Sequence, residues 1–506
     1  MIDFKKRSGL SRLAKYENFT LPSIIFHNKI NNENIIEKNW NKVKILNKEI
    51  ELPSLKELQE IEIEDKILLR DDIVIIPGLI TLEKRPKELI RKIFKARKDF
   101  GYRRIFYAPF IAKYLNLPIL HYLGIDLLDD LRCSSNECSI ELFNMEKMVL
   151  KAIEKNYFRV FVESIPDPLS KTLLRISDMD YFSTMEIFYP VTGSFLNASH
   201  FESLFRPDIQ RWIKRITENY EKPYHEIYAF LIPCSATKPY SKSRSHRFFK
   251  SIIEQSGKHV HEIIVTSPLG IVPRELEFTY PAKNYDIPVT GYWYEDEKKM
   301  LIETMEKFFS KNKYRKILAY LPDDLAFLEP YLKKLNADYV IGNLRDEINV
   351  KRILDLLGSL ENISINKNIF LADALNSIAS FQFNEKFPLE NKKIRRKFDE
   401  IFVYDDKETY LYFSPLNGNL LLYKKSAEYL MQKNKKIIEI DNFIPKGSIF
   451  AAGIINASDD IREGDEVIVH NNGRLIATGT ALMSYKDMLE QGRGEAVKVR
   501  HTFTSS

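Results

Sequence analysis

The sequence predicts a multidomain α/β protein that ends in a small β-barrel. Its 506 residues exceed one ordinary hydrophobic core, so three or four domains are expected. Strand-like and helix-like patterns alternate through residues 1–360, which is typical of parallel sheets joined by crossover helices. Residues 434–506 are rich instead in turns and short strands.

The first expected domain spans residues 1–222 and is built from β-then-α units. Residues 73–76 have the pattern of a buried strand, and an amphipathic helix follows from near Pro86. Residues 104–108 return as a strand, which Pro109 ends. Repeated units of this kind predict a parallel sheet or a (β/α) barrel.

The second expected domain spans residues 223–360 and is a doubly wound α/β core. A boundary is expected near Glu221-Lys222-Pro223, after a long helical region that ends at Tyr220. Strand candidates lie at 228–232, 261–265, 316–320 and 338–341, and helix candidates at about 247–256, 295–311, 323–335 and 346–358.

Two smaller domains complete the chain. Residues 361–433 are less regular, carry a basic run at 392–397, and are expected to form a small α+β connector. Within residues 434–506, Asn471-Asn472-Gly473 separates two apolar runs, which is a strong hairpin signal. A small β-barrel is therefore expected at the C-terminal end.

Composition and charge restrict the class of protein. Hydrophobic residues make up 44% and charged residues 29%, and no run approaches the roughly 18 apolar residues of a membrane span. The first residues lack the apolar core of a signal peptide, and three cysteines cannot build a disulfide framework. We therefore expect a cytoplasmic protein with no membrane partner. The net charge of +6 permits a polyanionic partner without requiring one.

Residues 233–246, Pro-Cys-Ser-Ala-Thr-Lys-Pro-Tyr-Ser-Lys-Ser-Arg-Ser-His, are the most informative segment. They join an expected strand to an expected helix, which places them at the carboxyl end of a strand, where open α/β sheets bind ligands. Nearby cations favour the thiolate of Cys234, which would then be a nucleophile. His246 or Lys238 would act as acid or base, with Tyr240 and Ser243 as hydrogen-bond donors. A structural cysteine beside a phosphate-binding basic loop is the alternative, and spacing alone leaves both open.

A second loop follows the expected strand at 261–265. Residues 266–277, Thr-Ser-Pro-Leu-Gly-Ile-Val-Pro-Arg-Glu-Leu-Glu, combine backbone-fixing Gly and Pro with an arginine and two carboxylates. Residues 285–293 are aromatic-rich and could stack on a flat base, although ordinary loop packing would have the same composition. From these segments we expect substrate contacts from Ser267, Gly270, Arg274, Glu275 and Gly291.

The first loop resembles a signature of the archaeosine synthase family, archaeal tRNA-modifying enzymes related to the tRNA-guanine transglycosylases. The signature is Pro-Cys-x3-Lys-Pro-Tyr-x2-Ser-x2-His, and the loop matches it at all seven fixed positions without a gap. The Ser-Pro-Leu-Gly, Val-Pro-Arg-Glu-Leu-Glu and Pro-Val-Thr-Gly runs also look like that family, and the resemblance covers the whole chain. The matching positions are Pro233, Cys234, Lys238, Pro239, Tyr240, Ser243 and His246.

Both ends of the chain also resemble parts of that family. Residues 449–501 resemble a PUA domain, a small RNA-binding pseudo-barrel, and the expected RNA contacts are the cationic side chains Arg462, Arg493, Lys498, Arg500 and His501. A solvated charged face is the alternative for these cations. Residues 122–129 look like the transglycosylase barrel, and Asp129 matches the nucleophile of active transglycosylases.

The departures from the transglycosylase pattern are as informative as the matches. No Asp-Ser-Gly-Gly-Phe-Gln-like segment supplies the second catalytic carboxylate. The family's zinc site has three cysteines and a histidine, whereas this chain offers only Cys133 and Cys138, and Phe143 precedes Asn144 where the histidine would stand. Two thiolates cannot close a tetrahedral zinc site. We expect a degenerate TIM-barrel-like domain, with no metal and no cofactor.

The resemblance implies a reaction on tRNA that carries 7-cyano-7-deazaguanine (preQ0) at position 15 of the D-loop. An amine donor would add to the nitrile carbon to give an amidine, with lysine as donor and a radical-SAM lyase partner completing the product, or with glutamine as donor. A homodimer is expected by family analogy alone. Two alternatives stay open: a transglycosylase that inserts preQ0 into tRNA, and a non-catalytic tRNA-binding subunit.

Overall fold

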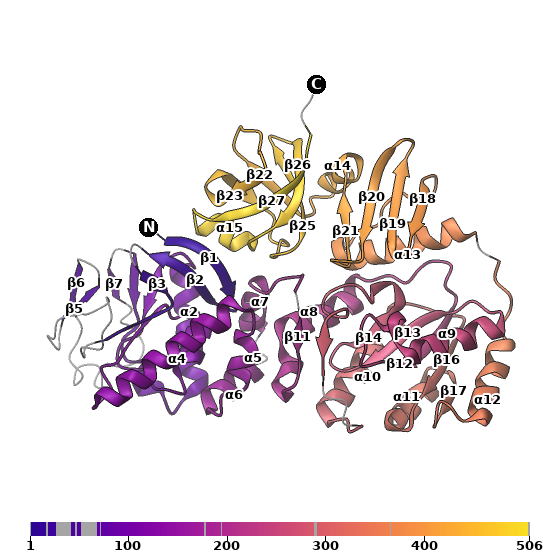
Figure 1. Ribbon diagram of the computed structural model, residues 1–506, viewed down its shortest axis with the longest axis horizontal. Coiled ribbons are helices and arrows are strands. Elements are labelled where there is room, and N and C mark those ends of the chain that lie inside the picture. The colour runs from indigo at the N-terminus through magenta and orange to yellow at the C-terminus, as the bar shows by residue number, and fades with distance from the viewer. Residues whose placement is uncertain are drawn as a thin grey trace. The chain divides into compact units, whose positions relative to one another are not determined.

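The computed structural model describes residues 2–16, 19–26, 42–45, 48–51, 68–70, 72–176, 179–193, 195–287, 291–364 and 366–503. They divide into two compact units, each drawn with its elements labelled in Figure 1. Unit 1 comprises residues 1–189, 445–463 and 481–498, and unit 2 comprises residues 190–444, 464–480 and 499–506. No helix in these described ranges is long and apolar enough to cross a membrane.

Unit 1 is built around an open five-stranded sheet. The order is β4-β10-β9-β8-β7, in which β7 alone pairs antiparallel. Its strands are β4 (Ser23–Ile25), β7 (Leu68–Arg70), β8 (Ile73–Ile75), β9 (Ile105–Tyr107) and β10 (Leu127–Asp129). The predicted strands at 73–76 and 104–108 are confirmed. A closed barrel is not confirmed, because β4 and β7 remain at the edges of the sheet within the described residues.

The remaining elements of unit 1 are a second sheet, a hairpin, six helices and part of the C-terminal region. The second sheet comprises β1 (Ile2–Ser8), β2 (Ser11–Tyr16) and β3 (Phe19–Leu21), and the hairpin comprises β5 (Lys42–Ile45) and β6 (Lys48–Glu51). The helices are α2 (Pro86–Phe100), α3 (Leu117–Tyr122), α4 (Asn136–Glu154), α5 (Phe158–Glu163), α6 (Pro168–Arg175) and α7 (Met179–Ile187). The C-terminal elements are β23 (Ser448–Phe450), β24 (Ile454–Ala457), α15 (Tyr485–Glu490) and the first half of β27 (Glu495–Thr502).

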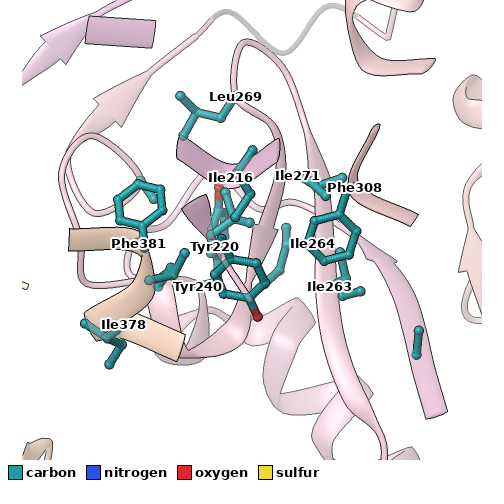
Figure 2. Close-up of a cluster of buried hydrophobic side chains, with 14 of the residues drawn as sticks. Ile216, Tyr220, Tyr240, Ile263, Ile264, Leu269, Ile271, Phe308, Ile378 and Phe381 are labelled. Carbon is teal, nitrogen blue, oxygen red and sulfur yellow. The ribbon is translucent and has the colours of Figure 1, made fainter. Parts of the chain in front are cut away.

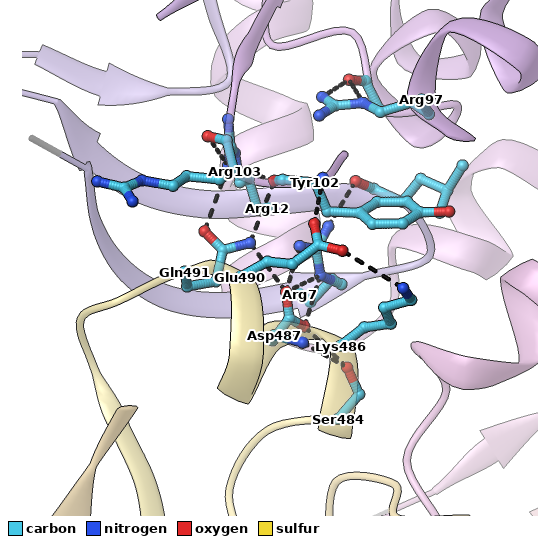
Figure 3. Close-up of polar contacts among 12 residues, drawn as sticks. Arg7, Arg12, Arg97, Tyr102, Arg103, Ser484, Lys486, Asp487, Glu490 and Gln491 are labelled. Carbon is cyan, nitrogen blue, oxygen red and sulfur yellow. Dashed lines mark hydrogen bonds and ion pairs between the residues drawn. The ribbon is translucent and has the colours of Figure 1, made fainter. Parts of the chain in front are cut away.

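The C-terminal helix α15 is fixed to the N-terminal part of unit 1 by buried polar contacts (Figure 3). Arg7 Nε donates to Asp487 Oδ2 across 2.8 Å, and both side chains are nearly fully buried. Tyr102 N donates to Glu490 Oε2 across 2.6 Å, and Gln491 Nε2 donates to the carbonyl of Tyr102 across 3.1 Å. These contacts join α15 to the end of α2.

Unit 2 contains the predicted α/β core, a five-stranded sheet in the order β14-β13-β12-β16-β17. Its strands are β12 (Tyr228–Pro233), β13 (His261–Thr266), β14 (Gly270–Pro273), β16 (Lys316–Leu321) and β17 (Asp338–Ile341). The helices are α9 (Arg244–Ser256), α10 (Glu295–Lys311), α11 (Glu329–Lys334) and α12 (Glu347–Gly358). All four predicted strands are confirmed. Residues 270–273, expected in a loop, instead extend the sheet because their backbone pairs antiparallel with the edge of β13.

The helical region before residue 222 packs into unit 2 and not into unit 1. It comprises β11 (Leu196–Asn197), which pairs with β15 (Tyr285–Asp286), then α8 (Pro207–Lys214) and a π-helical turn at Arg215–Asn219. Trp212 Nε1 donates to the carbonyl of Ile271 across 3.2 Å, and the ring of Tyr220 stacks on Phe308. Figure 2 shows Ile216 and Tyr220 among the buried apolar side chains of β13, β14 and α13. The structure therefore divides the chain near residue 190, not at the expected boundary.

The rest of unit 2 is the predicted connector and further C-terminal strands. The connector contains α13 (Lys367–Phe383), a four-stranded antiparallel sheet and α14 (Lys424–Gln432). The sheet strands are β18 (Lys393–Lys397), β19 (Glu400–Asp405), β20 (Glu408–Ser414) and β21 (Asn419–Leu422), so the basic run lies on an edge strand, where lysines discourage further pairing. The C-terminal strands are β22 (Ile437–Ile440), β25 (Glu466–Asn471) and β26 (Arg474–Ala481).

The predicted hairpin at Asn472-Gly473 is confirmed. Both residues have positive φ, 48° and 78°, and they join β25 to its antiparallel partner β26. Two consecutive residues with positive φ are what the commonest two-residue hairpin turn requires, and Asn-Gly adopts them at least cost.

Candidate functional site

The candidate site lies at the carboxyl edge of the unit 2 sheet, between β12 and β16. The chain passes from β12 to β13 on one side and later to β16 on the other, so the strand order reverses there. Open α/β sheets bind ligands in the crevice outside such a switch point. Cys234 directly follows β12, and Asp323 and Asp324 follow the end of β16 after a single proline.

Cys234 is a free, partly buried cysteine at this switch point. Its backbone N donates to the carbonyl of Val265 across 3.1 Å, which fixes the residue beside β13. Burial raises the pKa of the thiol, whereas a hydrogen bond with Thr266 and the charge of Lys238 act in the opposite direction, and Asp324 raises it further. The thiol form therefore dominates at neutral pH, and Lys238 is the cation placed to favour the thiolate.

Lys238 is the second partly accessible group of the loop. Its Nζ lies 4.0 Å from the centroid of the Tyr285 ring, in a cation–π contact. Burial lowers the pKa of Lys238, while Cys234 and Asp286 raise it. A lysine of lowered pKa beside a thiol of raised pKa is suited to exchanging a proton with it.

Behind this pair lies a row of buried hydroxyl groups. Tyr240 Oη is 2.7 Å from Tyr285 Oη, and Tyr285 Oη hydrogen-bonds in turn to Thr266 Oγ1. Tyr240 is fully buried, and Figure 2 shows it among the apolar side chains of the core. Burial raises the pKa of both phenols well above its ordinary value, so they stay protonated and act as hydrogen-bonding groups. The row ends at Thr266, beside the Cys234 thiol.

His246 lies at the far end of the loop and does not face solvent. It is 2% exposed, and its Nδ1 is 2.8 Å from Nη2 of Arg274. Burial lowers the pKa of His246, the charge of Arg274 lowers it further, and the carbonyl of Pro233 opposes them, giving a pKa of about 3. His246 is thus a neutral imidazole at physiological pH.

The turn at 274–277 braces the loop from below. Arg274 donates to Glu277 Oε2 across 3.1 Å and also pairs with Glu262. The same Glu277 oxygen accepts from the backbone N of Ser241 across 2.8 Å. These contacts tie the 233–246 loop to β13, so Arg274 is a positioning residue rather than an accessible substrate ligand.

Ser243 serves as the N-cap of α9. Its Oγ accepts a hydrogen bond from the backbone N of His246 across 3.1 Å, and the side chain is buried. N-cap serines satisfy one of the free N–H groups in the first helical turn. Of the five residues predicted to be catalytic, Cys234 and Lys238 are therefore the two with accessible reactive groups.

The predicted substrate contacts lie mostly in buried structural positions. Ser267 Oγ donates to Glu297 Oε1 across 2.6 Å, at the start of α10. A Cβ on Gly270 would approach the Thr304 side chain to 2.9 Å, which accounts for glycine there. Glu275 is paired with His261 at 3.0 Å. Gly291 is exposed, whereas residues 288–290 of the Pro-Val-Thr-Gly run lie outside the described residues.

Three groups at the site were not assigned a role from the sequence. Thr266 and Asp286 lie in segments that drew attention for other residues, and Asp324 was overlooked entirely. Its only signal is its place immediately after the predicted strand at 316–320, at the same sheet edge as Cys234.

The five predicted RNA contacts differ in accessibility. Arg493 and Lys498, both in unit 1, are exposed. Arg462 Nη2 pairs with Glu186 at 2.7 Å, and Arg500 pairs with the buried Glu466, so these two guanidinium groups are engaged within their own units. Burial lowers the pKa of His501, whose ring packs on Tyr423.

The position that matches the transglycosylase nucleophile is engaged in structure. Asp129 is fully buried and accepts hydrogen bonds from Tyr107 Oη at 2.8 Å and from the backbone N of Phe110. Cys133 and Cys138, expected to be what remains of a zinc site, are joined to each other in a disulfide. Within the described part of the chain, no group of three or more His, Cys, Asp or Glu residues could hold a metal ion.

Comparisons with known proteins agree with this architecture. A family model described as a domain of unknown function (DUF5591) matches residues 209–360, and a PUA domain model matches residues 439–503. A crystal structure of a protein of unknown function is 28% identical, covering 58% of this chain and all of that one, with a TM-score of 0.47. The tRNA-guanine(15) transglycosylase of Methanothermobacter thermautotrophicus is 26% identical over 59% of this chain and 43% of its own length.

Two relatives match over most of their length. The archaeosine synthase subunit alpha of Methanosarcina acetivorans is 29% identical, covering 85% of this chain and 80% of that protein. The archaeosine synthase subunit alpha of Thermoplasma acidophilum is 32% identical, covering 99% of this chain and the whole of that protein. The chain therefore belongs to the archaeosine synthase subunit alpha family.

Proposed function

We propose that this protein is a tRNA-modifying transferase that converts the nitrile of preQ0 in the D-loop of tRNA into an amidine during archaeosine formation. The observation that carries the proposal is the placement of the Cys234 thiol and the Lys238 amine together at the switch point of the sheet. Family membership supports the substrate, and the PUA domain supports RNA as the partner.

The first step is addition of the thiol to the nitrile. Lys238 takes the proton of Cys234, and the thiolate attacks the nitrile carbon while the Lys238 ammonium gives that proton to the nitrile nitrogen. One S–C bond forms, one C–N π bond breaks, and the product is a thioimidate. Because His246 is a neutral, buried imidazole, Lys238 is the better proton carrier.

The second step releases the thiol. The amine donor attacks the thioimidate carbon, its N–H proton passes through Lys238 to the departing sulfur, and the amidine forms as the C–S bond breaks. The donor is lysine or glutamine-derived nitrogen, and a lysine adduct would require a radical-SAM lyase partner to complete the product. In this scheme residues 223–360 carry the chemistry, residues 434–506 hold RNA, and residues 1–222 form a degenerate transglycosylase scaffold within a homodimer.

Two measurements test the proposal. Nucleosides from preQ0-tRNA incubated with the protein and lysine or glutamine would be analysed by mass spectrometry, and a mass gain of a whole lysine or of ammonia is expected. No gain with either donor, despite tRNA binding, would refute the enzyme function.

The second measurement separates covalent from direct attack. Intact-protein mass spectrometry after incubation with preQ0 substrate and no donor is expected to reveal an adduct on Cys234, absent in Cys234→Ala. If wild type forms no adduct but still turns over with donor, the amine attacks the nitrile directly and Cys234 is structural.

A further inference from the structure

A basic groove lies in unit 1, between α2 and α6, on the opposite side of the domain organisation from the proposed chemistry. Its volume is about 810 Å³. Its floor is apolar, formed by Ile90, Phe94 and Ile176, and none of its described lining residues is acidic. The cationic lining residues are Lys87, Arg91, Lys95, Lys98, Lys171 and Arg175.

The cations of α2 form one stripe. Lys87, Arg91 and Lys95 are spaced by four residues, so they share a face of the helix and rise by about 6 Å at each step. All three are exposed, and among the described residues no ion pair or hydrogen bond engages their side chains. Like charges held on one face repel each other, and a row of anionic charges placed beside them would relieve that repulsion.

We propose that this α2–α6 groove binds the phosphate backbone of the RNA substrate. A polyanionic strand offers the row of charges that the stripe complements, and cations lining a groove raise affinity by releasing counterions. A membrane surface fits less well, because the apolar residues of α2, including Leu89 and Ile93, are buried against the domain. The inference rests on the proposed function for the identity of the RNA as tRNA.

The contacts of α15 supply a second reason. Tyr102 follows the end of α2 and is hydrogen-bonded to Glu490 and Gln491, so the groove helix and this PUA segment belong to one unit (Figure 3). The exposed Arg493 follows two residues after Gln491. RNA held by the PUA segment is thereby kept near α2, which is about 22 Å long.

Charge reversal tests the groove directly. The full-length double variant Arg91→Glu/Lys95→Glu would be compared with wild type for binding of an unmodified tRNA transcript across a series of salt concentrations. The expected result is a Kd raised at least roughly tenfold and a slope of log Kd against log salt reduced by about 2. The matched control is Lys151→Glu/Lys155→Glu, two exposed lysines four residues apart at the end of α4, for which neither quantity should change.

A charge-conserving exchange keeps the test sharp. Arg91→Lys/Lys95→Arg should bind as wild type does, whereas a purely structural defect of the helix would weaken it as well. Protection of Lys95 from acetylation by bound tRNA, measured on the wild-type protein, gives the same answer if the reversed variant does not fold.

Unchanged tRNA binding by the folded reversed variant, or full acetylation of Lys95 in the complex, would overturn the proposal and leave an acidic protein as the partner of the groove. Neither result affects the nucleoside assay for nitrile conversion. If instead the wild-type protein binds tRNA through the groove but yields no product with either donor, the groove stands and the proposed reaction fails.

Discussion

The guanidinium of Arg274 donates a hydrogen bond to Nδ1 of His246 across 2.8 Å. Because a guanidinium carries only donors, Nδ1 must be unprotonated and the single imidazole proton resides on Nε2. Burial and the charge of Arg274 together lower the pKa of His246 to about 3. The last residue of the signature loop is therefore held as a neutral strut between α9 and the turn at 274–277.

This arrangement predicts how substitution of His246 changes the pH profile. His246→Asn keeps an acceptor toward Arg274 and should reduce turnover while leaving the shape of the profile unchanged between about pH 5 and 8. His246→Phe, which leaves the guanidinium without that acceptor, should lose more activity. The rate of preQ0-tRNA conversion over this range checks both, and disappearance of one limb of the profile in His246→Asn would instead identify His246 as the acid or base.

Lys238 should set the reactivity of Cys234. Burial raises the pKa of the thiol and the Lys238 charge opposes this rise, so Lys238→Gln should raise the thiol pKa further. Each unit of pKa lowers the thiolate fraction about tenfold, and alkylation at a fixed pH slows accordingly. The rate of iodoacetamide labelling of Cys234, followed by mass spectrometry against pH, measures the shift.

Lys242→Gln is the control for that experiment. Lys242 lies in the same loop but pairs with Asp399 at 2.8 Å, so its loss should leave the labelling rate unchanged. Lys238→Arg keeps the charge and should largely preserve reactivity. Equal slowing by Lys238→Gln and Lys242→Gln would mean that general loop charge, and not the placement of Lys238, controls the thiol.

Ser243 should matter to stability more than to chemistry. Ser243→Ala removes the N-cap of α9 and is expected to lower the free energy of unfolding by about 1 kcal/mol. Ser251→Ala in the same helix is the comparison, because Ser251 is exposed and its Oγ bonds only to the carbonyl of Phe248. Urea unfolding of both variants measures the difference, and a Ser243→Ala protein of wild-type stability that has lost activity would place Ser243 in substrate binding.

Sequence reasoning located the site correctly in the fold but could not separate its reactive members from its supporting ones. The position of residues 233–246 after a strand follows from local periodicity, and the structure puts them at the switch point of the sheet. Which side chains of the loop are buried depends on partners distant in the chain. Glu277 binds the backbone of Ser241 and Arg274 holds His246, and no local pattern encodes those two contacts.

The fold was predictable where one segment determines its own structure. The Asn472-Gly473 hairpin and the helix at 295–311 agree with expectation because turn chemistry and amphipathic spacing are local. The segment 270–273 did not, since a short apolar run becomes a strand only when the edge of β13 is free to pair with it. The expected boundary at 222 shifted for a similar reason, because the partner of Trp212 lies in β14.

A buried ion pair should make stability depend on pH. Burial lowers the pKa of His261, but Glu275 outweighs this effect and the net pKa lies above the ordinary 6.5. That contribution to stability is fully present below about pH 6.5 and is lost as the pH rises through the folded-state pKa. Burial raises the pKa of Glu275, yet His261 and Tyr220 bring it below the ordinary 4.5, so its contribution is present above that pH and is lost as the pH falls through the folded-state pKa.

The pair therefore stabilises the fold most between about pH 4.5 and 6.5. His261→Gln should show its largest loss of unfolding free energy in that window, and the loss should shrink as the pH rises above it. His259→Gln is the matched control, because His259 also faces a carboxylate, Glu226 at 3.0 Å, but is partly exposed. Denaturant unfolding at a series of pH values provides the measurement. A loss that is constant with pH, or that grows toward alkaline pH, would mean that His261 stabilises the core as a neutral side chain hydrogen-bonded to Tyr314 rather than as the partner of a charged Glu275.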